Sequence, residues 1–161
     1  LVDSFEISNH DVVFFLSIFM DICSLKKNRM NVLFIEDDMI ESMKLQRAIS
    51  KFQSKHKIIE AKNGEEALDI LHAGQLPDII LLDLNMPRMS GTEFLSIIKK
   101  DERFKYLPTI ILTTSENRVD LLKCFEIGIA GYIIKPLKYE DYESKLKKVF
   151  DYWEISELIK G

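Results

Sequence analysis

The sequence predicts an α/β fold built on one parallel sheet, and three observations lead to this prediction. Short apolar segments alternate with longer segments of helical periodicity, five of each. Glycine, asparagine or proline marks several of the junctions, as expected for turns. Residues 79–82, Ile-Ile-Leu-Leu, form an uninterrupted apolar run that is typical of a strand buried on both faces. Strands that alternate with helices in this way imply a parallel sheet with right-handed crossovers.

Five strands are predicted from the apolar segments. The first, third and fourth are the most apolar, so we expect them at the centre of the sheet, whereas the second has polar ends and suits an edge. Pro87 cannot join a hydrogen-bonded ladder, so the third strand must end near Asp83. The predicted strands span residues 31–35, 57–61, 79–82, 108–115 and 131–135.

Five helices are predicted to follow these strands. The first four span residues 39–54, 65–73, 92–100 and 116–127, and the last extends to about Ile159. Ser90 is a candidate N-cap, and Gly74 follows the end of the second helix. We expect the first helix to present Met39, Met43, Ala48 and Phe52 at helical spacing. The last helix shows one broad apolar stripe made of Tyr142, Leu146, Val149, Phe150 and Trp153.

Composition restricts the class of protein. The 161 residues are 47% hydrophobic and 30% charged, as expected for one soluble globular domain. The net charge of −4, with no lysine or arginine cluster, argues against nucleic acid as a direct partner. Cys23 and Cys124 lie far apart and form no zinc pattern with the three histidines, so we interpret them as reduced thiols. We expect His56 and His72 at helix surfaces or in loops.

Residues 1–29 differ from the remainder and are predicted to be an N-terminal extension, with the folded domain over residues 30–161. Residues 12–23 are almost wholly apolar but include Asp21, and they are fewer than the roughly 20 that a membrane span needs. No basic leading segment or small-residue cleavage site indicates a signal peptide. Three interpretations stay open: a short packed helix, an interface segment, or translated sequence upstream of a start at Met30, which is favoured.

Polar residues follow four of the predicted strands. They are Glu36-Asp37-Asp38, Asp83, Thr113-Thr114-Ser115 and Lys135-Pro136. A lone aspartate after a strand is more often a turn or cap residue, but the carboxyl ends of parallel strands share one edge, where α/β folds bind ligands. Converging carboxylates need a cation, and their oxygens suit Mg²⁺. A lysine and a hydroxyl at the same edge suit a phosphoryl group, and aspartate can be a nucleophile towards phosphorus.

Five short pieces of the sequence follow one another in a fixed order: VLFIEDD, NGEEAL, IILLDLNMPRMSG, PTIILTTS and GIAGYIIKP. In this order and spacing, the chain from Asn31 to about Trp153 resembles the receiver domains of two-component response regulators. Each piece alone is weak evidence, whereas all five together argue against chance similarity. The resemblance implies a flavodoxin-like, doubly wound sheet of five parallel strands in the order 2-1-3-4-5, with five helices.

The resemblance also implies a phosphoacceptor and Mg²⁺ site. Asp83 resembles the phosphoacceptor aspartate. Glu36 and Asp37 resemble the acidic pair that holds Mg²⁺, Asp37 directly and Glu36 through water. The backbone carbonyl of Asn85 would supply a further ligand. Asp38 is an additional carboxylate that we assign to the solvated rim or to the start of the following helix.

A conformational switch is implied in the same way. Thr113 resembles the hydroxyl that moves onto the phosphoryl group, Lys135 its charge partner, and Tyr132 the aromatic residue whose rotamer follows Thr113. Members of the family commonly have a cis peptide before the proline that corresponds to Pro136. The position of Ser115, two residues beyond Thr113, would influence how fast the phosphoryl group is lost.

The function that this resemblance implies is that of a cytoplasmic, stand-alone regulator and not an enzyme. It would accept phosphate from a histidine kinase or a histidine phosphotransfer protein. It would pass the signal to a downstream protein target through the face made by the helix after Ser115, the last strand and the last helix. We expect no nucleic acid partner, no membrane span, and a monomer or weak homodimer.

Three alternatives stay open from the sequence. A pseudo-receiver would keep the fold and act as an interaction module without phosphorylation. An aspartate-nucleophile phosphatase would usually need a second aspartate where Asn85 stands. A carrier of FMN would need a hydroxyl- and glycine-rich first loop, whereas residues 36–38 are acidic.

Overall fold

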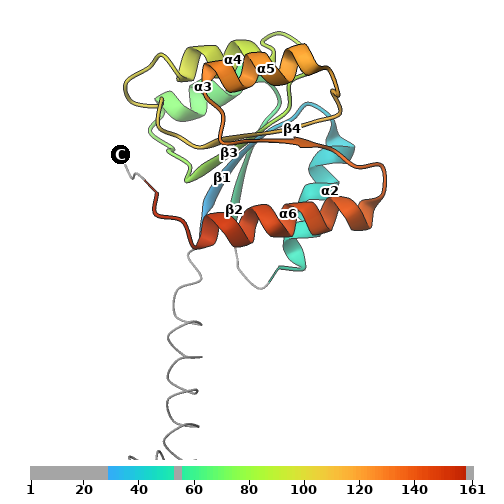
Figure 1. Cartoon of the computed structure of the whole chain (residues 1–161). Coiled ribbons are helices and arrows are strands. Elements are labelled where there is room, and N and C mark those ends of the chain that lie inside the picture. Colours follow the sequence, from blue (N-terminus) through green and yellow to red (C-terminus); the bar gives the residue numbers. More distant parts are fainter. Residues whose placement is uncertain (1–28, 53–55, 159–161) are drawn as a thin grey trace, which may run out of the picture.

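The structure, a computed structural model, describes residues 29–52 and 56–158 (Figure 1). Its centre is a five-stranded parallel sheet in the order β2-β1-β3-β4-β5, which confirms the predicted flavodoxin-like order. The strands are β1 (Asn31–Ile35), β2 (Lys57–Ala61), β3 (Ile79–Leu82), β4 (Thr109–Thr113) and β5 (Gly131–Ile134). The predicted extension over residues 1–29 lies outside the described residues except for Arg29, and its assignment stays a prediction.

Five helices cover the sheet within the described residues. They are α2 (Met39–Ser50), α3 (Gly64–His72), α4 (Gly91–Ile98), α5 (Arg118–Ile127) and α6 (Tyr139–Glu154). Helices α3, α4 and α5 lie on one face, and α2 and α6 lie on the other (Figure 1). None of the helices in this part of the chain is long and apolar enough to cross a membrane.

The core is divided between the two faces of the sheet. Successive side chains of a strand point to opposite faces. In β3, Ile80 and Leu82 therefore pack under α3, α4 and α5, whereas Ile79 and Leu81 pack against α2 and α6. All four are essentially buried, and full burial of such a side chain contributes about 1.5–3 kcal/mol. This two-sided burial explains why the segment contains no polar residue.

The helices have the predicted order, but α2 ends at Ser50 and not at residue 54, and its buried face differs from the prediction. Met39 and Met43 are mainly exposed, and the buried face of α2 consists of Leu45, Ala48 and Ile49. Of the residues predicted at helical spacing, Ala48 is buried and Phe52 packs against the same core cluster, whereas the two methionines do not. Helix α6 ends at Glu154 and not near Ile159, because the apolar stripe ends at Trp153 and the following Ile155 is exposed.

One further expectation is not met. All peptide bonds among the described residues are trans, so no cis peptide precedes Pro136. His56 lies in the loop before β2, as predicted, but its side chain is fully buried. Its Nε2 lies 3.0 Å from a carboxylate oxygen of Glu154, its Nδ1 accepts from the Met30 amide, and its ring stacks on Phe150 at 4.7 Å. The exposed position of His72 agrees with the prediction.

Candidate phosphoacceptor and cation site

The acidic residues after β1 have different surroundings. The β-ladder continues one residue beyond β1, because the Glu36 amide donates to the carbonyl of Ala61 at 2.9 Å. Glu36 is buried, whereas Asp37 and Asp38 are exposed. The Asp38 carboxylate accepts from the Ile40 amide at 2.8 Å and caps α2. The expected position of Asp38 at the start of the helix is confirmed. Glu36 and Asp37 are therefore the two residues of this acidic run that remain as candidate cation ligands.

Asp83 follows β3 directly, and the neighbouring backbone fixes its position. Its amide donates to the carbonyl of Ile35 at 3.0 Å, which sets Asp83 beside Glu36. Asp83 is only 5% exposed, and its Oδ1 has no hydrogen-bond partner among the described residues. Gly91 opens α4 so close to this loop that a Cβ there would lie 2.1 Å from the Asp83 carbonyl oxygen. Only glycine allows this close approach.

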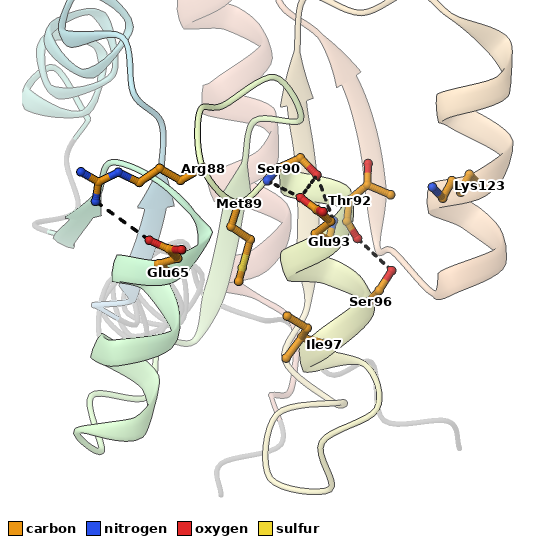
Figure 2. Close-up of a pocket in the computed structure, with 9 residues that line it drawn as sticks. All are labelled: Glu65, Arg88, Met89, Ser90, Thr92, Glu93, Ser96, Ile97 and Lys123. Carbon is orange, nitrogen blue, oxygen red and sulfur yellow. Dashed lines mark hydrogen bonds and ion pairs between the residues drawn. The ribbon is translucent and has the colours of Figure 1, made fainter.

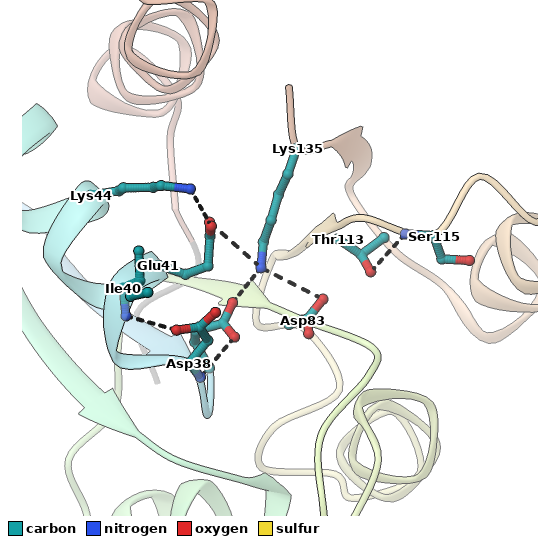
Figure 3. A network of polar contacts seen from close by, with 9 residues as sticks. Asp38, Ile40, Glu41, Lys44, Asp83, Thr113, Ser115 and Lys135 are labelled. Atoms are coloured by element: carbon teal, nitrogen blue, oxygen red, sulfur yellow. Dashed lines mark hydrogen bonds and ion pairs between the residues drawn. The ribbon is translucent and has the colours of Figure 1, made fainter. Parts of the chain in front are cut away.

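Three carboxylates and one lysine meet at this edge of the sheet. One oxygen each of Glu36, Asp37 and Asp83 lies within 4.8 Å of the others. Lys135 follows β5, where its amide donates to the Thr113 carbonyl at 2.7 Å. Its buried ammonium group pairs closely with Glu36 and lies 3.8 Å from Asp83 Oδ1 (Figure 3). The structure thus brings together residues that are about 100 positions apart in the sequence.

Burial controls the ionisation of Glu36. Loss of water contact raises the pKa of this carboxyl, while the hydrogen bond and the charge of Lys135 lower it and the nearby Asp83 raises it further. One ammonium group therefore faces more negative charge than it neutralises. A bound cation would relieve the remaining repulsion.

The donor set fits a small divalent cation. Mg²⁺ prefers carboxylate oxygens, uses one or two from the protein and retains several waters. The buried Asp83 Oδ1 has a lone pair that no described hydrogen bond uses, and the exposed Asp37 leaves the site open to water. Glu36, Asp37 and Asp83 are the residues that could hold the ion. Asn85 is exposed in the loop two residues further on, and the role of its carbonyl stays a prediction.

Thr113 and Tyr132 both contact the loop after β4. Thr113 is fully buried, and its Oγ1 accepts from the Ser115 amide at 3.3 Å. The Tyr132 hydroxyl donates to the Ser115 carbonyl at 3.1 Å. Burial raises the pKa of the Tyr132 hydroxyl, so this group remains a donor at neutral pH. Both residues contact the same loop, but their switch roles stay predictions.

Sequence reasoning missed two residues at this edge. Glu41, in the first turn of α2, places Oε2 3.9 Å from the ammonium group of Lys135. The Tyr142 hydroxyl of α6 is buried without a hydrogen-bond partner among the described residues. Burial raises its pKa, and the charges of Glu41 and Glu36 raise it further. Glu41 lies in the first turn of the helix that follows the acidic residues, a position that could have revealed it, whereas Tyr142 was interpreted only as part of the apolar stripe.

A separate hollow of about 700 Å³ lies between the start of α3, the loop before α4, α4 itself and α5 (Figure 2). Most of the charged and polar side chains that line it form hydrogen bonds or ion pairs with one another. Ser90 and Glu93 form a capping box at the start of α4, and Arg88 lies 4.0 Å from Glu65. No cluster of carboxylates like that at the strand ends lines this hollow, so it takes no part in the candidate site.

Comparison with known proteins agrees with this fold. Residues 32–147 match the family described as the response regulator receiver domain. The probable methanogenesis regulatory protein FilR2 of Methanothrix harundinacea is 35% identical over 127 residues, which cover 76% of this chain and 82% of that protein. Domains of this family are signalling domains and not classical enzymes. The chain belongs to the response regulator receiver domain family.

Two solved structures show how closely the fold is shared. The phosphorylated cyanobacterial phytochrome response regulator RcpA superposes with a TM-score of 0.78 at 27% identity, covering 83% of this chain and all of that chain. The Mn²⁺-bound form of response regulator Rcp1 superposes with a TM-score of 0.76 at 28% identity, covering 81% of this chain and 99% of that one. Both support the receiver fold over the described residues.

Proposed function

We propose that this domain accepts a phosphoryl group on Asp83 in a Mg²⁺-dependent reaction and signals through changed protein contacts. The observation that carries the proposal is the state of the Asp83 carboxylate. It is buried, one oxygen has no hydrogen-bond partner among the described residues, and two further carboxylates and an ammonium group lie around it. A structural capping aspartate would have its oxygens occupied by backbone amides.

The neighbouring residues fit complementary roles. An ion held by Glu36, Asp37 and Asp83 would neutralise charge on the attacking carboxylate and on the incoming phosphoryl group. In the transfer, an Asp83 oxygen forms the new bond to phosphorus, and the bond from phosphorus to the donor nitrogen breaks. The Lys135 ammonium is already 3.8 Å from Asp83 and can pair with the added negative charge.

The signal would leave through the face formed by α5, β5 and α6. A groove of about 570 Å³ lies there, lined mainly by apolar side chains together with Lys145 and Lys148. Tyr132 lines this groove and also donates to the Ser115 carbonyl in the loop that contacts Thr113. Movement of Thr113 towards a phosphoryl group would therefore change the shape of the groove through Tyr132.

The proposed phosphate donor is a histidine kinase or a histidine phosphotransfer protein, and the proposed recipient of the signal is a downstream protein. Receiver domains interact with partners of these kinds, and relatives of this chain are described in phosphorylated and Mn²⁺-bound forms. These descriptions support phosphorylation and cation binding as functions of this chain.

Incubation with acetyl phosphate and Mg²⁺, followed by intact mass spectrometry, tests the proposal. We expect the wild-type chain to gain the mass of one phosphoryl group, and to gain none when Mg²⁺ is replaced by EDTA. Asp83→Asn should abolish the gain. Asp38→Asn is the matched control, because asparagine preserves the cap of α2 while it removes a neighbouring carboxylate.

The competing function is an interaction module that does not use phosphate. Absence of any mass gain in the wild-type chain would favour it, and an undiminished gain in Asp83→Asn would move the acceptor elsewhere. The residues of the site argue against this competitor, because a module without phosphoryl chemistry has no use for a cluster of mutually repulsive carboxylates, two of them buried.

A further inference from the structure

The ammonium group of Lys135 lies close to three carboxylates. Its ammonium group pairs closely with Glu36, lies 3.8 Å from Asp83, and lies 3.9 Å from Glu41. Glu41 and Asp83 approach the ammonium group from opposite sides (Figure 3). The Lys135 side chain is 6% exposed, so water does not screen these interactions well. Glu41 therefore competes with Asp83 for the same cation.

The second oxygen of Glu41 has its own partner. Oε1 pairs with the Lys44 amine at 2.6 Å, one turn further along α2, and the Lys44 side chain is 40% exposed. Glu41 thus connects a solvent-exposed lysine to the buried Lys135. The Tyr142 hydroxyl is buried near this network, and the charge of Glu41 helps to raise the pKa of that hydroxyl.

We propose that Glu41 is a positioning residue that holds the Lys135 ammonium back from Asp83, and that Lys44 sets the strength of this hold. The proposal rests on the function proposed above, because Lys135 matters most when Asp83 carries a phosphoryl group. Glu41 stabilises the state without phosphate, since the phosphoryl group must draw Lys135 away from it. Lys44 weakens the hold because it neutralises part of the Glu41 charge.

Beryllofluoride, added with Mg²⁺, serves as a stable mimic of the phosphoryl group, and calorimetric titration gives its affinity. Glu41→Gln should bind it about fivefold more tightly than the wild-type chain, and Lys44→Gln should bind it more weakly. Glu102→Gln is the matched control, because it removes a carboxylate of the same charge from an exposed pair with Lys105 far along the chain. It should leave the affinity unchanged.

A simple change of local potential would also favour an anion, so the same substitution is made in a Lys135→Met background. If Glu41 acts through Lys135, the fivefold gain disappears in that background. If the gain persists there, the potential alone causes it and the proposal is overturned.

A measurement without phosphate keeps this test separate from that of the proposed function. Burial of the Lys135 ammonium makes its ¹⁵N and ¹H signals suitable for NMR in the metal-free protein. Glu41→Gln should shift these signals, and Glu102→Gln should not. Unshifted signals contradict the role of Glu41 whatever Asp83 does. If Glu41→Gln shifts the Lys135 signals but the wild-type chain never binds beryllofluoride, the result contradicts the proposed function and not the role of Glu41.

Discussion

Buried ionisable groups occur at both edges of the sheet, but they are arranged in opposite ways. At the amino edge, His56 and Glu154 form a single pair 3.0 Å apart, packed on Phe150 and joined to the backbone at Met30. At the carboxyl edge, several carboxylates surround one ammonium group, and the Asp83 Oδ1 has no described hydrogen-bond partner.

This difference separates structural burial of charge from functional burial. A single imidazole–carboxylate contact fixes the end of α6 near the start of β1 and β2 and needs no ligand. An excess of one sign raises the free energy of the folded chain and is relieved only when a cation or a phosphoryl group changes the balance. The two edges should therefore respond to charge removal with opposite signs.

The largest expected effect is the loss of stability in His56→Ala. The substitution removes the ring that stacks on Phe150 and leaves the buried Glu154 carboxylate without its imidazole partner, so the free energy of unfolding should fall by about 3 kcal/mol. Urea denaturation followed by circular dichroism measures it. His72→Ala is the control, since this exposed histidine should cost less than about 0.5 kcal/mol. Equal losses of unfolding free energy in the two variants would contradict the structural role that we assign to His56 and Glu154.

The second effect has the opposite sign. Asp37→Asn removes one of the three clustered carboxylates, and in EDTA it should raise the free energy of unfolding by about 1 kcal/mol, a value reduced for the exposure of Asp37. Addition of Mg²⁺ should stabilise the wild-type chain and have less effect on the variant.

Asp38→Asn is again the informative control for this substitution. It removes a neighbouring negative charge but leaves the cluster intact, so it should show no gain in EDTA and a normal response to Mg²⁺. If Asp37→Asn is destabilising in EDTA, repulsion at the carboxyl edge is not significant and the contrast between the edges fails. Thermal unfolding with and without Mg²⁺ gives both measurements.

Much of the carboxyl edge could be predicted from sequence because parallel strands impose it. Once β1, β3 and β5 are recognised, residues that follow them must meet at one edge, and Glu36, Asp83 and Lys135 do so through ladder hydrogen bonds that extend beyond each strand. The central positions of β1, β3 and β4 followed from their apolar content, whereas the full strand order followed from the resemblance to receiver domains.

The features that sequence reasoning missed depend on packing between helices. The burial of His56 results from the approach of the end of α6, and the positions of Glu41 and Tyr142 depend on how α2 and α6 lie across one sheet face. Helical periodicity identifies an apolar stripe but not which of two stripes is buried, as Met39 and Met43 show. Contacts of this kind are not local in the sequence.

The smallest expected effect concerns a matched pair that is not buried. Asp101 accepts two hydrogen bonds from the Arg103 side chain and one from its amide, and these hydrogen bonds lower the pKa of Asp101 to about 2. A lowered carboxyl pKa means that the pair stabilises the folded state fully above the ordinary value of 3.8, and that this contribution is lost as the pH falls through 3.8 towards about 2. Asp101→Asn should therefore be slightly less stable than the wild-type chain at pH 6, and the difference should shrink between pH 4 and pH 2. Urea denaturation across this range measures the difference in the free energy of unfolding.

Because solvent screens this exposed pair, the loss of stability at pH 6 should stay well below that of His56→Ala. If Asp101→Asn loses as much stability as His56→Ala, burial does not determine how much such a pair contributes.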